Sequence, residues 1–404
     1  MLRRTLILAA LGILLSGCSV PEEARLPSNV TAFQGARLII GNGEVIEDAT
    51  FTVDDGRFVA VGPARDVAVP DGAARVDLSG LTVMPAIIDA HVHMSTTRDA
   101  LIRDLRQRAM QGIAAAMSLG TDGPDAPLEL RDEVIPGAAR YLTAGRGITM
   151  PEPGRSDVPH WITNATEARQ AVRDEAARNV DIIKIWVDDR NGQYAKLSPE
   201  LYGAIIDEAH QHGLRVTAHI FTLEDAKGLL RAGVDAFAHG VRDRDIDDEF
   251  IDLILERPNV VVVPNLPSRG MPTDLSWLRD VLSAEALQAA EANNTVRPEM
   301  HEAHGIQARN LKRLSDAGVT IAFGTDGNTF WAPHVEMEDM VAAGMSPGDV
   351  IVAATRNAAE VAGLPDLGTI EPGKSADFIV LEANPLEDIT NTRRIVEVYL
   401  RGDI

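Results

Sequence analysis

Residues 81–94 read LTVMPAIIDAHVHM, and this stretch decides the fold prediction. The apolar run at residues 86–88 follows a proline and is typical of a strand buried on both faces of a parallel sheet. The run leads into His91 and His93. Side chains two residues apart on a strand point to the same face, so both imidazoles are expected to aim at one point. Because imidazole is a common ligand of divalent metals, the stretch predicts a metal site at the end of a buried strand.

The chain that follows this stretch alternates short apolar segments with helical segments. Strands are expected at residues 83–89, 114–118, 140–144, 182–187, 215–219, 236–239, 260–264 and 320–324. Helices are expected at residues 98–111, 167–178, 199–212, 223–232 and 301–317, and Gly213, Gly233 and Gly318 follow three of them as helix-ending residues. Strands that alternate with helices form parallel sheets, so the pattern predicts an α/β fold with a (β/α)8 TIM-like barrel over residues 83–363.

The sequence pattern differs on both sides of this region, where short predicted strands are separated by turn-forming residues. Residues 34–82 contain Gly41-Asn42-Gly43 and Asp55-Gly56, which are typical of hairpin turns. Residues 364–404 return to the same pattern. We therefore expect a small β-sandwich domain built from both chain ends, with the barrel inserted between its two parts.

The first residues have the features of an export signal. Residues 1–17 combine a basic start with a short apolar run, which is typical of a signal peptide. Cys18 follows Leu-Ser-Gly, as in a bacterial lipobox, and residues 18–33 are expected to form a polar tether. The alternative is an ordinary signal peptide with a chance cysteine. A lipid on Cys18 would anchor the protein at the periplasmic face of the outer membrane, and Cys18→Ser would then release it from the membrane fraction.

The composition limits the possible partners. Sixty acidic residues against 38 basic ones give a formal net charge of −22 over 404 residues. Such a surface repels nucleic acid, so a small-molecule substrate is the expected partner, and an oligomer is possible. The chain has one cysteine, which excludes an internal disulfide.

Ionisable side chains recur where the predicted strands end. Lys184 lies in the fourth strand, His219 and His239 end the fifth and sixth, and Asp326 follows the eighth. The active groups of barrels lie at these C-terminal strand ends, so the four residues are expected to join the two histidines of the first strand. Each of these residues alone is more often a core or surface residue than a metal ligand. The agreement of all six positions favours a metal site.

This set resembles the amidohydrolase superfamily in its binuclear, carboxylated-lysine branch, and looks most like the prolidase and imidazolonepropionase-like subgroup. The flanks DLSGLTVMPAIIDAHVHM and LGTIEPGKSADFIVLEANPLEDI share the resemblance, with Ala86 where the family usually has glycine. The resemblance implies two divalent ions, expected to be zinc, and a CO2-derived carbamate on Lys184 that bridges them. The other implied ligands are His91, His93 and Asp326 for one ion, and His219 and His239 for the second.

The resemblance also implies a reaction. A hydroxide held between the metals would cleave an amide bond in a peptide or an N-acyl amino acid, with Asp326 as acid and base. Opening of a cyclic amide or a lactone is the alternative. A mononuclear deaminase is disfavoured, because that branch has a glutamate three residues after the fifth-strand histidine and Thr222 stands there. A non-catalytic ligand-binding lipoprotein is disfavoured because none of the six ligands is missing.

The loops after the strands are expected to select the substrate. The candidates are Trp186 and Arg190 after the fourth strand, Arg242 after the sixth and Asn265 after the seventh. Either arginine is suited to bind a substrate carboxylate with two parallel hydrogen bonds, or it forms a salt bridge with a neighbouring aspartate. Ordinary core or surface roles are expected for His160, His210, His212, His301, His304 and His334.

Overall fold

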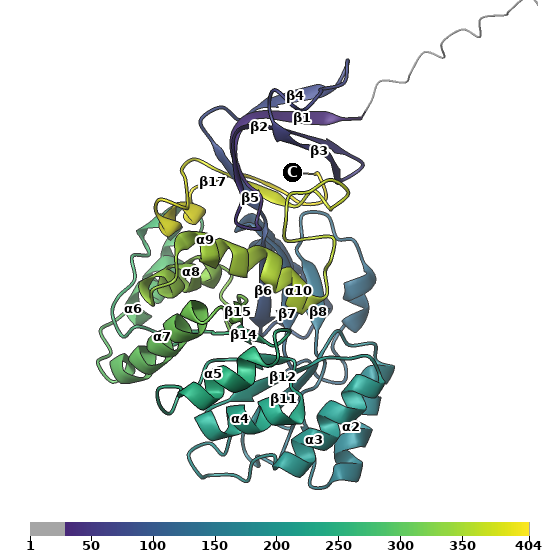
Figure 1. Ribbon diagram of the computed structural model, residues 1–404, viewed down its shortest axis with the longest axis vertical. Helices are drawn as coiled ribbons and strands as arrows, with labels where there is room; N and C mark the ends of the chain where they lie inside the picture. The colour runs from purple at the N-terminus through teal and green to yellow at the C-terminus, as the bar shows by residue number, and fades with distance from the viewer. Residues whose placement is uncertain (1–28, 404) are drawn as a thin grey trace, which may run out of the picture.

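The computed structural model describes residues 29–403. The predicted signal peptide, Cys18 and most of the predicted tether lie outside these residues. Within them the chain is an α/β protein, with a β-sheet layer at one end and parallel strands surrounded by helices below it (Figure 1). No helix of the described part is long and apolar enough to cross a membrane.

The sheet at the top of Figure 1 joins both ends of the described chain. Its strands are β1 (Thr31–Ile39), β2 (Val45–Asp54), β3 (Arg57–Pro63), β4 (Ala74–Asp77), β5 (Thr82–Pro85), β16 (Phe378–Leu381) and β17 (Ile395–Tyr399). Their order is β17-β16-β5-β1-β2-β3, with β4 paired to β1. We predicted a sandwich, but the hydrogen bonds form one sheet, because a single edge of β1 pairs with β4 and then with β5.

The core of this sheet is a cluster of aromatic rings. Phe33 stacks on Phe51 with ring centroids 4.8 Å apart, and both rings meet Phe378 edge to face at 5.2 Å. A backbone hydrogen bond from the Phe58 N–H to the Lys374 carbonyl oxygen also ties β3 to the segment that precedes β16. Aromatic rings bury a large apolar area, so this cluster stabilises the pairing of strands that are distant in sequence.

The parallel strands form two sheets. The first contains β6 (Ile87–Val92), β7 (Ile113–Ser118) and β8 (Arg140–Thr143). The second, in the order β10-β9-β11-β12-β13-β14-β15, contains β9 (Ile148–Thr149), β10 (His160–Trp161), β11 (Ile183–Val187), β12 (Val216–Ile220), β13 (Ala236–Ala238), β14 (Val261–Val263) and β15 (Thr320–Ile321). The edges of the two sheets are in contact, since Asp181 N donates to Thr143 O at 2.9 Å and Ala90 N to Phe323 O at 3.0 Å.

All the predicted strands are present, with one correction. The strand expected at residues 83–89 divides at Ala86 into β5, which belongs to the upper sheet, and β6, which begins the parallel sheet. The Ala86 N–H bonds to Asp377 of the upper layer, whereas the Ile87 N–H bonds to Gly112 beside β7. The short strands β9 and β10 were not predicted.

The five predicted helices are also present. They are α1 (Arg98–Met110), α2 (Ala165–Ala177), α3 (Pro199–Gln211), α4 (Leu223–Ala232) and α7 (Met300–Asp316). Gly213, Gly233 and Gly318 follow three of them with φ of 70°, 105° and 79°, which confirms their helix-ending role. Not predicted were α5 (Asp248–Leu255), α6 (Ala284–Asn293), α8 (Ala332–Ala342), α9 (Pro347–Val352), α10 (Ala358–Ala362), and the short turns η1 (Leu128–Asp132), η2 (Ser276–Asp280), η3 (Ala353–Asn357) and η4 (Ile389–Arg393).

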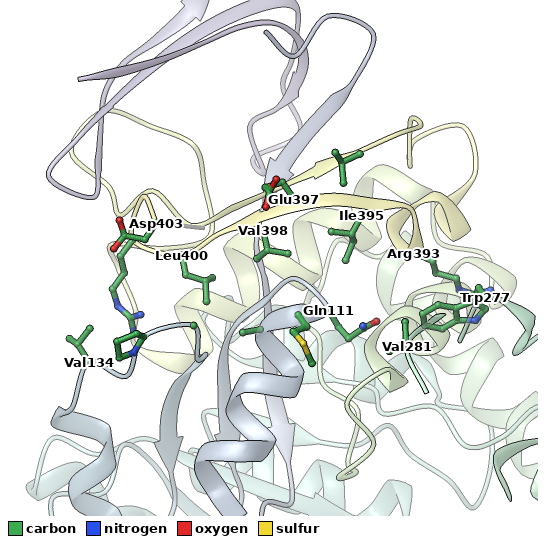
Figure 2. Close-up of a pocket in the computed structure, with 16 residues that line it drawn as sticks. Gln111, Val134, Trp277, Val281, Arg393, Ile395, Glu397, Val398, Leu400 and Asp403 are labelled. Carbon is green, nitrogen blue, oxygen red and sulfur yellow. The ribbon is translucent and has the colours of Figure 1, made fainter. Parts of the chain in front are cut away.

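A groove of about 570 Å³ runs between β17, the end of α1 and η2 (Figure 2). Its walls are largely apolar, with Leu400 and Val134 towards one end and Trp277 at the other. None of the predicted metal ligands lines it. The groove therefore lies apart from the cluster of strand-end residues.

Candidate metal centre

The structure brings the six predicted metal ligands together, with Asp326 among the histidines. Its Oδ1 lies 3.1 Å from His91 Nε2 and 2.9 Å from His93 Nε2. Its Oδ2 lies 3.7 Å from His239 Nε2. His91, His239 and Asp326 each place a ligand atom within 4.8 Å of the others, which is close enough to share one ion.

Lys184 and His219 complete the cluster from β11 and β12. Lys184 Nζ lies 3.4 Å from His91 Nε2, and the side chain is buried with 1% of the residue exposed. The His219 ring packs against the His239 ring at 4.6 Å between centroids. Four of these residues are buried, whereas the side chains of His93 and Asp326 are 33% and 36% exposed. The cluster is therefore open to solvent on one side, where a substrate can enter.

The backbone at the strand ends is unusual. Asp326, His239, Asn265 and Arg190 follow strands and have φ of 55°, 132°, 45° and 54°. Residues other than glycine seldom adopt positive φ, and such positions concentrate at functional sites. The turns after β11, β13, β14 and β15 therefore hold these side chains in conformations that the local sequence disfavours.

Burial favours the neutral form of the three buried imidazoles, His91, His219 and His239. It is the main cause that lowers the pKa of His91 to about 4 and that of His219 to about 3, and it lowers the pKa of His239 well below its usual value. Burial alone would raise the pKa of Asp326, but the interactions with His91 and His93 lower it well below the usual range. Neutral imidazoles beside an ionised carboxylate are the forms that ligate divalent metals.

Two further observations support the binding of a metal ion by these residues. The Nδ1 atom of His239 is buried and has no hydrogen-bond partner among the described residues. Lys184 forms no ion pair within the described chain, and burial is the main cause that lowers its pKa to about 7. A buried polar atom without a partner costs free energy, and a cation bound to the lone pair of an unprotonated Nδ1 would remove that cost for His239.

Three ligands are oriented by side chains that the sequence did not identify as supports. Asn265 Oδ1 lies 2.9 Å from His91 Nδ1, and Thr121 Oγ1 lies 3.0 Å from His93 Nδ1. The third is His219, whose Nε2 lies 3.0 Å from Asp188 Oδ2. Such partners fix the tautomer and the ring orientation of a ligating histidine. No pattern in the sequence shows them, because each partner comes from a different strand end or loop.

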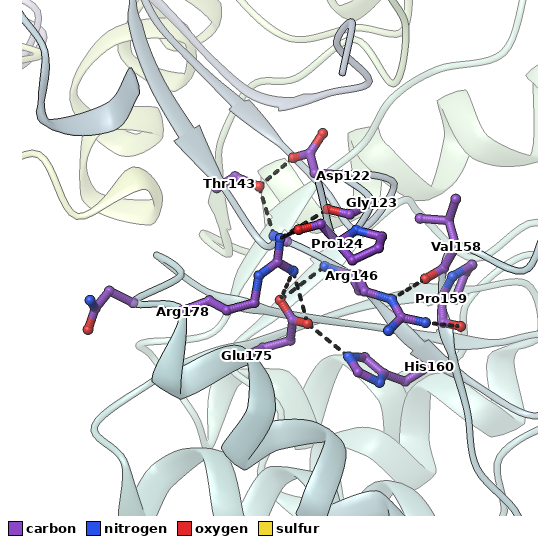
Figure 3. Close-up of polar contacts among 12 residues, drawn as sticks. Asp122, Gly123, Pro124, Thr143, Arg146, Val158, Pro159, His160, Glu175 and Arg178 are labelled. Atoms are coloured by element: carbon purple, nitrogen blue, oxygen red, sulfur yellow. Dashed lines mark hydrogen bonds and ion pairs between the residues drawn. The ribbon is translucent and has the colours of Figure 1, made fainter. Parts of the chain in front are cut away.

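A network of polar contacts holds the loops beyond β7 and β8 (Figure 3). The buried carboxylate of Glu175 lies 2.8 Å from His160 Nε2 and 2.8 Å from Arg178 Nη1. Arg178 in turn donates to the carbonyl oxygen of Gly123 at 3.0 Å. The network thereby fixes the loop that supports His93, and His160 has this structural role instead of a place in the ligand cluster.

Three of the four predicted substrate-binding residues differ in their polar contacts. Arg190 is paired with Asp188 at 2.6 Å and with Glu152 at 3.1 Å, so the salt-bridge alternative holds for it. Arg242 forms no ion pair with a described residue, and its Nε atom is buried without a hydrogen-bond partner. Asn265 contacts His91 through its oxygen, and its Nδ2 atom is buried without a hydrogen-bond partner among the described residues.

Trp186 packs behind Lys184. The Lys184 Nζ lies 5.6 Å from the centre of the indole ring. A Cβ added at Gly147 would lie 2.0 Å from this ring, and one added at Gly120 would lie 2.5 Å from it, so both glycines are needed for the contact. The ring therefore covers Lys184, which is a packing role that the sequence alone did not indicate.

Most of the remaining histidines have the ordinary roles that were expected. His210 and His212 contact Asp235 and Glu208 on the surface. His304 contacts the carbonyl oxygen of Pro267, and the buried His334 contacts Thr392 and the carbonyl oxygen of Gln111. Thr222 caps α4 by accepting the Asp225 N–H, so the position at which a deaminase has its glutamate serves the helix here.

The chain is similar to known proteins over most of its length. The profile described as "Amidohydrolase family" matches residues 82–404. The chain is 26% identical to ochratoxinase of Aspergillus niger over 90% of this chain and 83% of that protein. It is 25% identical to imidazolonepropionase of Deinococcus radiodurans over 90% of this chain and 93% of that protein. The crystal structure of a candidate prolidase from Bifidobacterium longum is 28% identical, with a TM-score of 0.77, over 93% of this chain and 94% of that one.

Proposed function

From the premise that the chain belongs to the amidohydrolase family, and is a hydrolase acting on carbon–nitrogen bonds, we propose that it cleaves the amide bond of a dipeptide or an N-acyl amino acid. The observation that carries the proposal is the contact of one Asp326 carboxylate with three imidazoles at the open end of the parallel strands. This is the position at which barrel enzymes carry their active groups.

The ligand set fits two divalent ions, which we propose to be zinc. His91, His93 and Asp326 would hold one ion, and the histidines of β12 and β13 would hold the second. Lys184 would bridge them as a carbamate, which its buried position beside His91 supports. When bound, such ions polarise a carbonyl oxygen and lower the pKa of water towards neutrality.

The protein side chains have separate tasks in this proposal. Asp326 accepts the proton of the attacking water at a carboxylate oxygen and transfers it to the leaving nitrogen. Asn265, Thr121 and Asp188 keep the imidazoles in the orientation that the geometry records. Arg242, which has no ion-pair partner among the described residues, binds an anionic group of the substrate. Opening of a cyclic amide or a lactone stays the alternative, because the same side chains serve that reaction.

We also propose that the two parallel sheets form one closed (β/α)8 barrel over residues 83–363, with a small domain from residues 34–82 and 364–404. The backbone bonds between the ends of β8 and β11 and between β6 and the segment after β15 support closure. An experimental structure in which either edge is open to solvent would contradict it. The lipid anchor on Cys18 stays a prediction for a part of the chain outside the described residues.

A substrate panel tests the proposed function. The zinc-loaded protein is expected to release amine from at least one dipeptide or N-acyl amino acid, with kcat/KM of roughly 10⁴ M⁻¹s⁻¹ or more on a good substrate. The panel should include cyclic amides, lactones and aminopurines, with release followed by mass spectrometry. Ammonia release from aminopurines without amide cleavage would contradict the proposal, and lactone opening alone would favour the alternative.

Arg242 provides a prediction about the substrate. Arg242→Gln removes the charge and keeps a polar side chain, so KM for a carboxylate-bearing substrate is expected to rise at least about tenfold. KM for the corresponding neutral amide should change little. The matched control is Arg244→Gln, because Arg244 is exposed and pairs with Asp243 at 2.7 Å. Equal effects of Arg242→Gln on charged and neutral substrates would exclude this role.

A further inference from the structure

A fully buried ion pair lies behind Asp326 and contributes none of the predicted metal ligands. Asp89 of β6 and Arg108 in the last turn of α1 both have side chains that are 0% exposed, and Arg108 Nη1 lies 3.3 Å from Asp89 Oδ2. Burying two charges carries a large desolvation cost, and apolar residues of similar volume often stabilise a fold equally well. The position of the pair therefore calls for an explanation other than stability.

The two partners hold the residues on either side of Asp326. Asp89 Oδ1 accepts the Thr325 N–H at 3.0 Å, and Asp89 Oδ2 accepts the Thr325 hydroxyl at 2.8 Å. Arg108 Nη2 donates to the carbonyl oxygen of Gly327 at 3.1 Å. The pair thus forms hydrogen bonds to the residues immediately before and immediately after Asp326. The Asp326 side chain itself faces the histidines.

The turn at Asp326 needs such support. Its φ of 55° lies in the left-handed region, which is costly for residues other than glycine and persists only where the surroundings hold it. The Asp326 N–H bonds to His91 O at 2.8 Å, which fixes the backbone at one further point. A small rotation of this turn would move the carboxylate away from His91 and His93, which it contacts through a single oxygen.

We propose that Asp89 and Arg108 are positioning residues that aim the Asp326 carboxylate at the metals. Their contribution is to metal retention and turnover, and not to the stability of the fold. This inference rests on the proposed function, since it assigns the purpose of the pair to the centre that Asp326 serves.

The test replaces the pair with apolar residues, as Asp89→Leu together with Arg108→Met. The melting temperature is expected to stay the same or to rise, whereas the zinc affinity of the metal-free protein should fall roughly 10- to 100-fold in competition with a chelator. The kcat should fall with it and KM should change little. The matched control is Arg140→Met with Asp377→Leu, a largely buried pair at 2.6 Å that does not contact the ligand turn. That control is expected to keep the zinc affinity of the wild type.

A milder pair of variants covers the case in which the double variant does not fold. Thr325→Val removes only the hydroxyl bond to Asp89, and roughly tenfold weaker zinc binding is expected. Thr325→Ser keeps the hydroxyl and should restore the affinity to within about twofold of the wild type. Equal zinc affinities and kcat values for the wild type, Thr325→Val and Thr325→Ser would overturn the inference.

The zinc measurements separate this inference from the proposed function. A wild-type protein that binds zinc but cleaves no amide contradicts the proposed function, while the affinities of the variants still decide the positioning role. A wild-type protein that binds no zinc overturns both.

Discussion

Lys184→Ala is expected to lose zinc and at least about a hundredfold in kcat while it keeps its fold. The side chain is buried beside His91 and has no ion-pair partner in the described chain, so it is placed to hold metals once it carries a carbamate. Zinc per chain, measured by elemental analysis, should be close to two in the wild type and well below that in the variant. Circular dichroism would show whether the fold is retained.

A short carboxylic acid should partly restore the Lys184→Ala variant. Formate or acetate offers two oxygens, as a carbamate does, and fits the space that the lysine side chain leaves. Activity is expected to return only when the acid and zinc are added together. Lys184→Arg should be inactive, because a guanidinium stays cationic and repels metal ions. An active Lys184→Arg enzyme would exclude the bridge.

Lys227 offers a matched control for this rescue. It is also a buried lysine, with 3% of the residue exposed, but it pairs with Asp247 and Glu249 beside α4. Lys227→Ala is expected to cost stability through the loss of these pairs, and added formate should not raise its activity. Rescue of both variants by the acid would mean that the effect is not specific to the metal centre.

Asp326→Asn is expected to lower kcat by roughly 10³-fold or more while KM changes little. The amide has the same shape as the carboxylate but does not take up a proton from water, and it binds metals weakly. The measurement is steady-state kinetics on the substrate that the panel identifies, together with zinc content. Asp245→Asn is the control, because Asp245 is exposed and pairs with Arg309 at 2.7 Å. An Asp326→Asn enzyme within about tenfold of the wild type would remove Asp326 from the proton transfer.

The order of the strands and the identity of the clustered residues could be predicted from the sequence. Alternation of apolar strands with helices is a local pattern, and parallel strands place their C-terminal ends at one edge. His91, Lys184, His219 and Asp326 could therefore be grouped before any contact was known. The boundary at Ala86 could not be predicted, because β5 and β6 form one continuous apolar run and separate only through pairing with different partners.

The partners of the site residues were decided by the tertiary structure. Arg190 and Arg242 look alike in the sequence, yet Arg190 meets Glu152, which is distant in the chain, and Arg242 meets no carboxylate among the described residues. Asn265 contacts His91 from a turn with positive φ, and no periodic pattern encodes such a turn.

By itself the sequence predicted which ionisable residues lie together at the strand ends, since their positions follow from the alternation of strands and helices, while the family resemblance implied their roles. Only the tertiary structure decided how each of them is held. The ion pair of Asp89 and Arg108 and its hydrogen bonds to the Asp326 turn connect β6, α1 and the segment after β15. Such contacts depend on the packing of elements that are far apart in the chain, and a local pattern contains no record of that packing.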